Sequence, residues 1–320
     1  MALALQEAVA AGLTLRVNVG EQCQYDCGYC RPGQLRAPTR SSERVQPAEY
    51  ERLARLFGAV GVTKVRFTGG EPLLRADFAE IVAAFRRGLP RATFALTTNG
   101  ERLDALLDAP PEGLSAVTVH VDSLRPGRYR DLMGPGDVDA VLSSALRAKT
   151  MGLHTKLNVV VQRGLNDDEL EDFLTWSWRS DIEVRFIELM NTGSANDFTR
   201  AHFFSGAELV ARLGALRLGR RHPADPACLY RSASGTVFGV IASDTAPFCD
   251  ACARLRLSAD GRLRGCLYEP GGAPLLASMR AGWTEAMLSE ALQRSVSDKR
   301  SHHPARPGPR AQFSMAELGG

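Results

Sequence analysis

The sequence predicts an α/β protein, in which a partial (β/α)6 barrel of the TIM type is followed by a smaller C-terminal α+β module. Two observations carry this prediction. Between residues 13 and 189, short β-branched runs alternate with stretches of helical spacing, and beyond residue 189 this rhythm ends. The chain has 320 residues, of which 44% are hydrophobic and 23% charged, so it has enough apolar material for such a core. Disorder of the whole chain is excluded.

Six runs are predicted to be strands: 13–19, 62–67, 93–97, 116–121, 155–161 and 183–189. Helix starts lie between them. Pro47 suits the first position of a helix over 48–60. Asp77 can cap the next helix, Asp137 a helix over 138–151, and Asn166 a helix over 167–179. Six βα units in series imply parallel strands with right-handed crossovers. Six units are fewer than the eight that close a barrel, so we expect the barrel to be open. We therefore expect the chemistry at the carboxyl ends of the strands.

The C-terminal part is predicted to contain a helix over 207–213 and strands over 236–242 and 254–258. Asp260-Gly261 is a strong hairpin signal and leads into a strand over 262–268. The predicted domains are therefore a barrel at 1–190, a second module at 191–298, and a flexible tail at 299–320 that ends in Gly319-Gly320.

Charge and cysteine content limit the function classes. Lys plus Arg is 39 and Asp plus Glu is 36, so the net charge is +3, too small for bulk attraction to nucleic acid or membrane. The chain has neither an apolar run of about 18 residues nor a secretory signal, which predicts a cytoplasmic protein with no nucleic-acid or membrane partner. Its seven cysteines are then expected to be metal ligands or redox groups rather than disulfides.

The first cysteine trio is Cys23-x3-Cys27-x2-Cys30, directly beyond the first predicted strand. Three thiolates this close can bind one face of an iron–sulfur cube and leave one iron open. An open iron can bind a cofactor, much as an open zinc position serves a catalytic site. A structural zinc knuckle is the alternative, but it needs a fourth ligand, and the nearest candidate in the sequence, His120, is far away.

The second trio is Cys249-x2-Cys252-x13-Cys266, which brackets the predicted hairpin. A zinc ribbon and an iron–sulfur site both fit this spacing, and Cys228 could supply a fourth ligand for zinc. The spacing alone does not decide between a zinc ribbon and an iron–sulfur site.

The first trio, with Tyr29 before its last cysteine and the sequence TGGEP at 68–72, resembles the radical S-adenosylmethionine (SAM) superfamily. Within it, the chain is similar to the GTP 3′,8-cyclase family of molybdenum cofactor biosynthesis. The further motifs are LRV at 15–17, VRFTGGEPLLR at 65–75, LTTNG at 96–100, KLN at 156–158, RFIE at 185–188, and the stretch from Phe248-Cys249 through RLRL at 254–257 to Cys266-Leu267. The resemblance covers residues 13–268, and Gly319-Gly320 resembles the ending of that family.

This resemblance implies two [4Fe-4S] clusters, one on each trio, with SAM bound at the first. It implies SAM contacts at Tyr29, Gly69, Gly70, Glu71, His120 and Met190. It implies GTP contacts at Arg16, Arg66, Thr97, Lys156, Arg254, Leu255 and Arg256. Arg16 and the first three cysteines are the implied catalytic residues. Because Arg254 and Arg256 share one face of a strand, Leu255 can reach the site only through its backbone or by packing.

The implied reaction begins when an adenosyl radical removes the ribose 3′ hydrogen of GTP. The carbon radical attacks C8 of guanine, which the second open iron would hold, and one-electron reduction gives 3′,8-cyclo-7,8-dihydro-GTP. The implied partners are an electron donor such as a flavodoxin and the downstream cyclic pyranopterin monophosphate synthase, and the chain is expected to be a monomer or homodimer. Gly319-Gly320 either enters the site or is a frayed end.

Three positions depart from the family pattern. His120 stands where the family usually has serine, Arg31 where it has methionine, and Asn191 where it has proline. Two alternatives therefore stay open: a two-cluster radical SAM paralogue that acts on another nucleotide or small substrate, and a non-catalytic zinc-binding module. Cys228 fits neither trio of the family pattern and is interpreted as a spare thiol.

Overall fold

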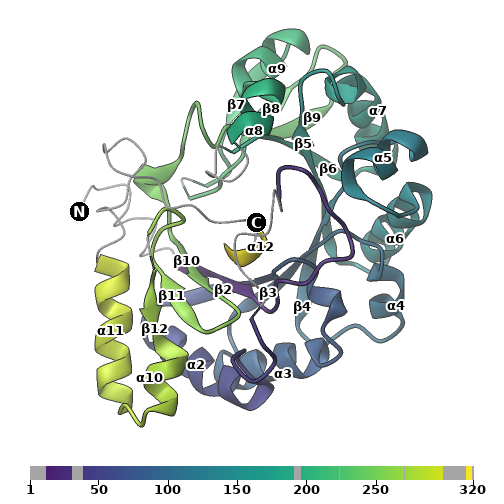
Figure 1. Cartoon of the computed structure of the whole chain (residues 1–320). Helices are drawn as coiled ribbons and strands as arrows, with labels where there is room; N and C mark the ends of the chain where they lie inside the picture. The colour runs from purple at the N-terminus through teal and green to yellow at the C-terminus, as the bar shows by residue number, and fades with distance from the viewer. Residues whose placement is uncertain are drawn as a thin grey trace.

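The computed structural model describes residues 12–30, 39–190, 196–222, 224–269, 271–297 and 315–318. These residues form one sheet of twelve strands in the order β12-β11-β10-β1-β2-β3-β4-β5-β6-β9-β8-β7, which curves inside a ring of helices (Figure 1). The strands are β1 (Leu13–Asn18), β2 (Val62–Thr68), β3 (Thr93–Thr98), β4 (Leu114–His120), β5 (His154–Val161), β6 (Glu183–Glu188), β7 (Leu216–Gly219), β8 (Cys228–Arg231), β9 (Val237–Ile241), β10 (Arg254–Leu257), β11 (Arg262–Arg264) and β12 (Ala273–Pro274).

The six predicted βα units are confirmed. Strands β1 to β6 agree with the predicted strands within two residues at either end, and each pairs in parallel with the next. The helices of this part are α2 (Pro47–Ala59), α3 (Phe78–Gly88), α4 (Leu103–Asp108), α5 (Pro126–Met133), α6 (Val138–Thr150) and α7 (Leu170–Ser180), with the 3-10 helices η1 (Pro72–Leu74) and η2 (Asp167–Glu169).

All four predicted helix starts are confirmed as positions. Pro47 is the first residue of α2, and the Asp137 carboxylate caps α6 by accepting from the main-chain N–H groups of Asp139 and Ala140. Asp77 is the N-cap of α3, although its carboxylate binds a neighbouring arginine instead of the helix. Asn166 is the N-cap of η2, which leads into α7, although its side-chain amide donates to main-chain carbonyls at the ends of β4 and β5 instead of binding the helix.

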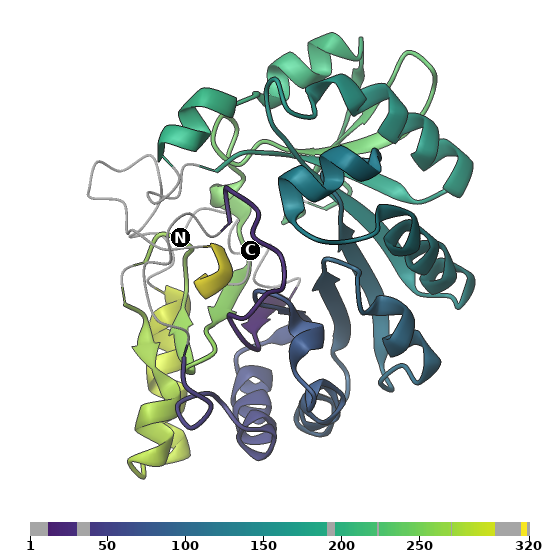
Figure 2. The same cartoon turned by 45° about the vertical axis from the view of Figure 1, so that its right-hand side comes forward.

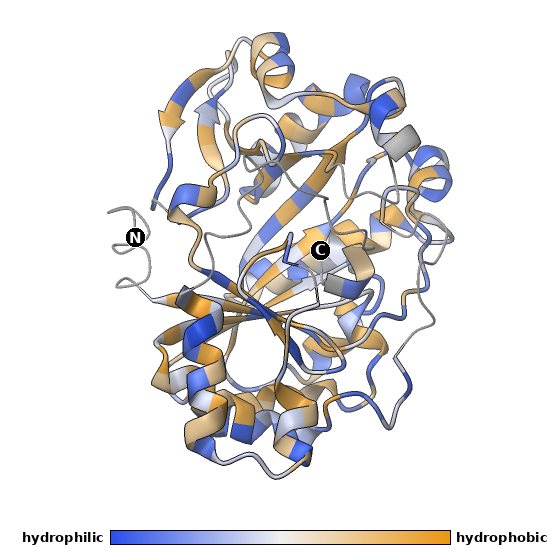
Figure 3. Ribbon diagram, turned by 60° about the vertical axis from the view of Figure 1, so that its left-hand side comes forward, coloured by the Kyte–Doolittle hydropathy of each residue, from blue (hydrophilic) through white to orange (hydrophobic). Residues whose placement is uncertain are grey.

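The two faces of the parallel strands differ in polarity. Leu15 and Val17 of β1, like Val65 of β2, are fully buried on the side that the helices cover. Arg16 and Arg66 alternate with them and therefore point to the concave side. Figure 3 shows this alternation of hydrophobic and hydrophilic residues along the strands. The sheet therefore encloses a polar lumen, where a closed barrel would have a packed core.

The C-terminal strands extend the same sheet at both of its edges. β9 pairs in parallel with β6 and β10 pairs in parallel with β1, so eight strands run in one direction. β8 and β7 continue antiparallel from β9, and β11 and β12 from β10. The helices here are α8 (Asn196–His202), α9 (Gly206–Arg212), η3 (Cys249–Ala251), α10 (Leu275–Arg280), α11 (Glu285–Ser297) and α12 (Met315–Leu318).

The predicted helix over 207–213 and the predicted strands over 236–242 and 254–258 are confirmed as α9, β9 and β10. The Asp260-Gly261 hairpin is confirmed as well, but β11 ends at Arg264 rather than at 268. The strands β7, β8 and β12 and most of the C-terminal helices were not predicted. The domain boundaries at 190 and 298 stay predictions.

Residues 242–253 connect the two edges of the parallel array, and we call them the crossing segment. Because β9 and β10 run in the same direction, this segment returns from the carboxyl end of β9 to the amino end of β10. It carries Cys249 and Cys252 of the second trio. The segment therefore brings these two cysteines to the amino end of the sheet.

The last described helix, α12, lies inside the ring of strands in two different views (Figures 1 and 2). At the end of β1, the Asn18 side-chain amide donates to the carbonyls of Ala316 and Glu317, at 2.7 and 2.8 Å. Gly319-Gly320, Arg31 and Asn191 lie outside the described residues. In the part of the chain that the structure describes, no helix is both long enough and apolar enough to cross a membrane.

Candidate functional site

The first cysteine trio lies in the loop that follows β1, at the carboxyl end of the sheet. The Cys30 N–H donates to the Cys27 carbonyl at 2.9 Å, and the Asn99 side-chain nitrogen lies 3.8 Å from Cys23 Sγ. Burial, together with the charges of Asp122 and of the other two thiols, raises the pKa of Cys27 well above its usual value. The three thiols are thus close enough to influence one another.

Gly69 and Gly70 support this loop directly. The Gly70 N–H donates to the Gly20 carbonyl at 2.8 Å, and the Glu71 N–H donates to the Gln22 carbonyl at 2.7 Å. A Cβ on Gly70 would lie 2.4 Å from the Gln22 oxygen, and one on Gly69 would lie 2.3 Å from the Gly20 oxygen. Glycine is needed here because two stretches of backbone approach each other closely. The predicted contacts of Gly69 and Gly70 with SAM stay predictions.

We expect Gly70→Ala to displace the backbone at residues 20–22 and to loosen the loop that carries Cys23. Overpacking of this kind costs about 1–3 kcal/mol, so the melting temperature and the iron bound after reconstitution should both fall. Gly127→Ala is the matched control, because a Cβ at that position in α5 meets nothing within 4 Å and alanine favours the helix. Equal iron binding by the two variants would contradict this role of Gly70.

Glu71 fastens the same loop to the end of β3. Its buried carboxylate accepts from the Thr98 hydroxyl and from the Asn99 and Leu73 N–H groups, all within 2.9 Å. Burial raises the pKa of Glu71 to about 7. The contact with SAM predicted for Glu71 stays a prediction.

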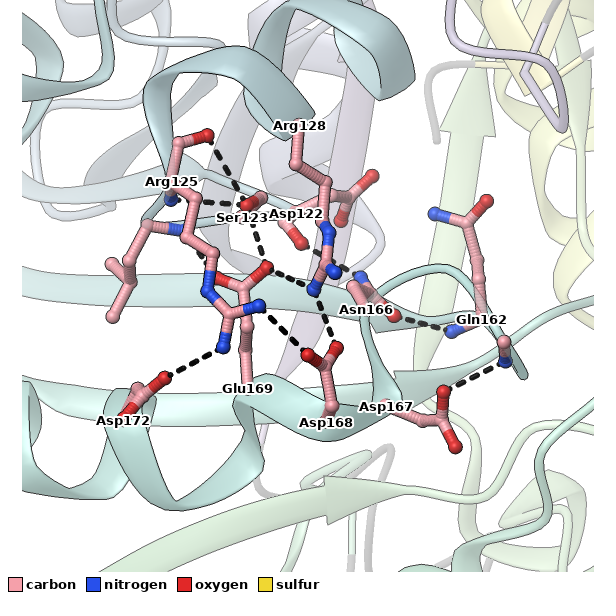
Figure 4. Close-up of polar contacts among 12 residues, drawn as sticks. Asp122, Ser123, Arg125, Arg128, Gln162, Asn166, Asp167, Asp168, Glu169 and Asp172 are labelled. Atoms are coloured by element: carbon pink, nitrogen blue, oxygen red, sulfur yellow. Dashed lines mark hydrogen bonds and ion pairs between the residues drawn. The ribbon is translucent and has the colours of Figure 1, made fainter.

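Tyr29 and His120, two of the predicted SAM residues, are in direct contact. The Tyr29 hydroxyl donates to Asp122 Oδ2 at 2.8 Å and lies 2.5 Å from His120 Nε2. Burial lowers the pKa of His120, but the charge of Asp122, 3.2 Å away, and its hydrogen bond to the ring together outweigh burial and raise the pKa overall. Sequence reasoning missed Asp122, which the amide of Asn166 and the N–H of Val160 hold in place (Figure 4).

Arg16, Arg66 and Arg256 lie side by side on three neighbouring strands. The register pairs Arg16 with Arg256 on one side and with Arg66 on the other. Arg66 Nη1 donates to the hydroxyls of Thr97 and Thr118, at 3.0 and 2.9 Å. The structure thus brings together four of the predicted GTP residues. Leu255 is fully buried and faces away from the lumen, as expected for its place between two arginines.

These guanidinium groups lower one another's pKa. Burial, followed by the charges of three neighbouring arginines, lowers the pKa of Arg16 well below its usual value. Burial and the charge of Arg254 lower the pKa of Arg66 and of Arg256 to about 10. Both values lie above neutral pH, so the lumen concentrates positive charge away from water. Such a site favours a polyanion, whose charge relieves this repulsion.

On the other side of the lumen, the charges are mixed. Lys156 Nζ lies 3.8 Å from Glu183, which also accepts from Arg185 at 2.5 Å, and Arg185 in turn lies 3.3 Å from Asp225. Sequence reasoning missed Lys64, Glu183 and Arg185 as residues of the site. The signal was present, because β2, β6 and β10 each carry charged residues at alternate positions in otherwise apolar strands.

The second trio surrounds the amino end of β10. The thiols of Cys249 and Cys252 raise the pKa of Arg254, and those of Cys252 and Cys266 raise the pKa of Arg256, although burial lowers both values overall. The Arg254 guanidinium also lies 4.7 Å from the centre of the Phe248 ring. All three cysteines therefore lie near the arginines of one strand.

The two trios occupy opposite ends of the paired strands β1 and β10, and the arginines lie between them. The expectation that all the chemistry lies at the carboxyl ends of the strands thus holds for the first trio and is wrong for the second. The physical reason is the crossing segment, which returns to the amino end before β10 begins. Cys228 lies apart on β8, where Arg217 Nε is 3.3 Å from its sulfur.

Each trio offers three cysteine thiols, which is the ligand set of an iron–sulfur cube with one open iron. Among the described residues, no three His, Cys, Asp or Glu side chains converge as a single bound metal ion would require. A cube spreads three thiolates over three irons, so its ligands need not converge on one point.

Comparisons with known proteins show the family of this chain. A family model described as the radical SAM superfamily matches residues 17–177, and one described as Molybdenum Cofactor Synthesis C matches residues 182–305. The chain is therefore a radical SAM protein. The enzyme named GTP 3′,8-cyclase 3 of Mycobacterium bovis is 37% identical over 295 residues, 89% of this chain and 78% of the relative. The GTP 3′,8-cyclase of Edwardsiella ictaluri is 37% identical over 90% of both chains. This chain belongs to the GTP 3′,8-cyclase family.

Among solved structures, Streptococcus suis SuiB bound to S-adenosylmethionine is similar over 59% of this chain and 43% of that chain. The TM-score is 0.48 and the sequence identity 19%.

Proposed function

We propose that this protein is a radical SAM enzyme that converts GTP into 3′,8-cyclo-7,8-dihydro-GTP, the first step of molybdenum cofactor biosynthesis. One observation carries the proposal: a lumen lined by buried arginines separates two cysteine trios. A triphosphate carries about four negative charges and suits this lumen. The family of the chain supports the same reaction.

Cys23, Cys27 and Cys30 would hold the first [4Fe-4S] cluster, and Cys249, Cys252 and Cys266 the second. When bound, the first cluster and SAM supply the radical that removes hydrogen from the ribose, and the second cluster supplies an open iron for the guanine base. The chain's own residues bind and orient the substrate. Holding the two reacting carbons in contact is their main contribution.

The arginines and threonines of the lumen would fix the triphosphate. The guanidinium groups of Arg16 and Arg256 are planar, and each can donate two parallel hydrogen bonds to phosphate oxygens. The Thr97 hydroxyl accepts from Arg66 and can turn its own hydrogen toward an anion. At the carboxyl end, Tyr29 of the first cysteine loop contacts His120, and Met190 lies two residues beyond β6 with a half-buried side chain. These three residues would line the SAM side of the cavity.

The substrate assignment is tested with the anaerobically reconstituted chain, GTP, SAM and dithionite. We expect 5′-deoxyadenosine and the cyclised nucleotide in equal amounts, identified by mass spectrometry. Formation of 5′-deoxyadenosine without a product derived from GTP would contradict the assignment of GTP as the substrate. It would favour a paralogue that acts on another substrate. A colourless protein that holds zinc would contradict radical chemistry altogether. The flavodoxin-like electron donor, the downstream synthase, the oligomeric state and the cytoplasmic location stay predictions.

Lys156 predicts a specific pH dependence of GTP use. Burial, followed by the charge of Arg185, lowers the pKa of Lys156 to about 8, although Glu183 and Asp225 partly offset this. Its ammonium therefore loses its proton, and with it an attraction for triphosphate, as the pH rises through about 8. We expect kcat/KM for GTP to be level below that pH and to fall above it.

The measurement is kcat/KM for GTP between about pH 6.5 and pH 9.5, in the wild type and in Lys156→Met. The variant should be less active, and its kcat/KM should no longer fall near the pKa of Lys156 in the wild type. Lys149→Met is the control, because Lys149 pairs with Asp181 on the outside of the barrel and should leave the step in place. A step that persists in Lys156→Met would assign it to another group.

A further inference from the structure

Glu188, the last residue of β6, has a role that the proposed function does not use. Its carboxylate is only 3% exposed and accepts four hydrogen bonds. Oε1 accepts from the Gly206 N–H at 2.7 Å and from the Thr245 hydroxyl, and Oε2 accepts from the N–H groups of Asp244 and Thr245, both at 3.0 Å. The bond from Gly206 is buried, so that N–H would lose its only described acceptor if the carboxylate were removed. Asp244 and Thr245 are exposed residues, and their bonds to Glu188 fix where the chain runs.

Three of these four donors belong to the crossing segment. Glu188 thus holds the segment shortly after it leaves β9 and four residues before Cys249. On the far side, Phe248 packs against the Arg254 guanidinium of β10. The fourth donor, Gly206, begins α9, so one side chain joins β6, α9 and the crossing segment.

We propose that Glu188 is a positioning residue for the second cysteine trio. By fixing the start of the crossing segment at the carboxyl end of β6, it keeps Cys249 and Cys252 at the amino end of β10, where Cys266 arrives from β11. This role rests on the proposed function only in taking the second trio to hold a cluster. Glu188 would act on the trio through the crossing segment, which its hydrogen bonds hold.

Glu188→Gln is the informative substitution. A glutamine side chain has the same shape but only one oxygen, so the donors that face its NH2 group lose their acceptor. The matched control is Glu169→Gln. Glu169 is fully buried and accepts from the Ser123 hydroxyl, the Leu124 N–H and Arg128, on the α7 side of the barrel and away from the crossing segment (Figure 4).

The first measurement is amide hydrogen exchange of the full chain without clusters. We expect exchange at residues 243–253 to rise about tenfold in Glu188→Gln and to stay unchanged there in Glu169→Gln. The second is iron content and the electron paramagnetic resonance signal after reconstitution. Glu188→Gln should bind about four irons instead of about eight and keep the signal of the first cluster, whereas Glu169→Gln should bind the full amount.

A Glu188→Gln chain with both clusters and unchanged exchange at 243–253 would overturn the proposal. So would equal changes in the two variants, which would reduce Glu188 to general stability. If Glu188→Gln does not fold, Thr245→Val removes a single donor and should show the same changes to a smaller degree. Neither readout needs GTP, so a wild-type chain that failed to cyclise GTP would contradict the proposed function alone. A wild-type chain with only four irons would contradict both.

Discussion

Cys249→Ala is expected to abolish cyclisation of GTP and to leave the reductive cleavage of SAM in place. The two trios lie on different elements, one in the loop after β1 and the other around the amino end of β10. Loss of one ligand of the second trio should therefore not disturb the first. Iron content should fall from about eight to about four per chain, because a cube is not held stably by two thiolates alone. Product formation should fall by more than about 100-fold, since the open iron that would hold guanine is lost.

The chain offers a matched control for this variant. Cys228 lies on β8, toward the opposite edge of the sheet from β10, where it is buried and contacts Arg217. Cys228→Ala should keep about eight irons and full cyclisation. Iron analysis, 5′-deoxyadenosine yield and nucleotide product are measured on both variants. If Cys249→Ala still cyclises GTP, the second trio has no part in the reaction, and if Cys228→Ala loses iron, the trio has been assigned to the wrong cysteines.

The strands of the barrel could be predicted because their signal is local. Buried residues such as Leu15 and Val17 show the apolar pattern of a covered strand, and helix signals such as Pro47 separate one strand from the next. The places of β9 and β10 could not be predicted in this way. β10 pairs with the first strand of the barrel and β9 with the sixth, and only tertiary packing decides which edge each one joins.

The candidate site shows the same difference between features with a local sequence signal and features set by tertiary contacts. Both cysteine trios could be found from spacing, because their members are close in sequence. The contacts of Asn166 with Asp122, and of Glu188 with the crossing segment, join residues that are distant in sequence. Asn166 stands directly before a helix, as its local signal predicts, but its side chain does not cap that helix. Its side chain is instead used where β4 and β5 end, and no local pattern reports that use.

Arg16→Met is expected to weaken the use of GTP strongly without a matching loss of stability. Charge-assisted hydrogen bonds to phosphate contribute about 1.5–3 kcal/mol, so kcat/KM for GTP should fall about 10- to 100-fold. In the GTP-free enzyme, however, burial and three neighbouring arginines disfavour the Arg16 charge, as its lowered pKa shows. Methionine has a similar length and no charge, so the melting temperature of the GTP-free chain should stay level or rise.

The opposite directions of the two effects separate this explanation from simple misfolding. Arg294→Met is the control, because Arg294 is exposed on α11 and pairs with Glu290 one helical turn earlier. It should change neither kcat/KM nor the melting temperature. Arg16→Lys should recover part of the activity, since it restores the charge but lacks the planar fork. If the melting temperature of Arg16→Met falls together with its activity, Arg16 supports the fold. The main evidence that the lumen binds a triphosphate would then be lost.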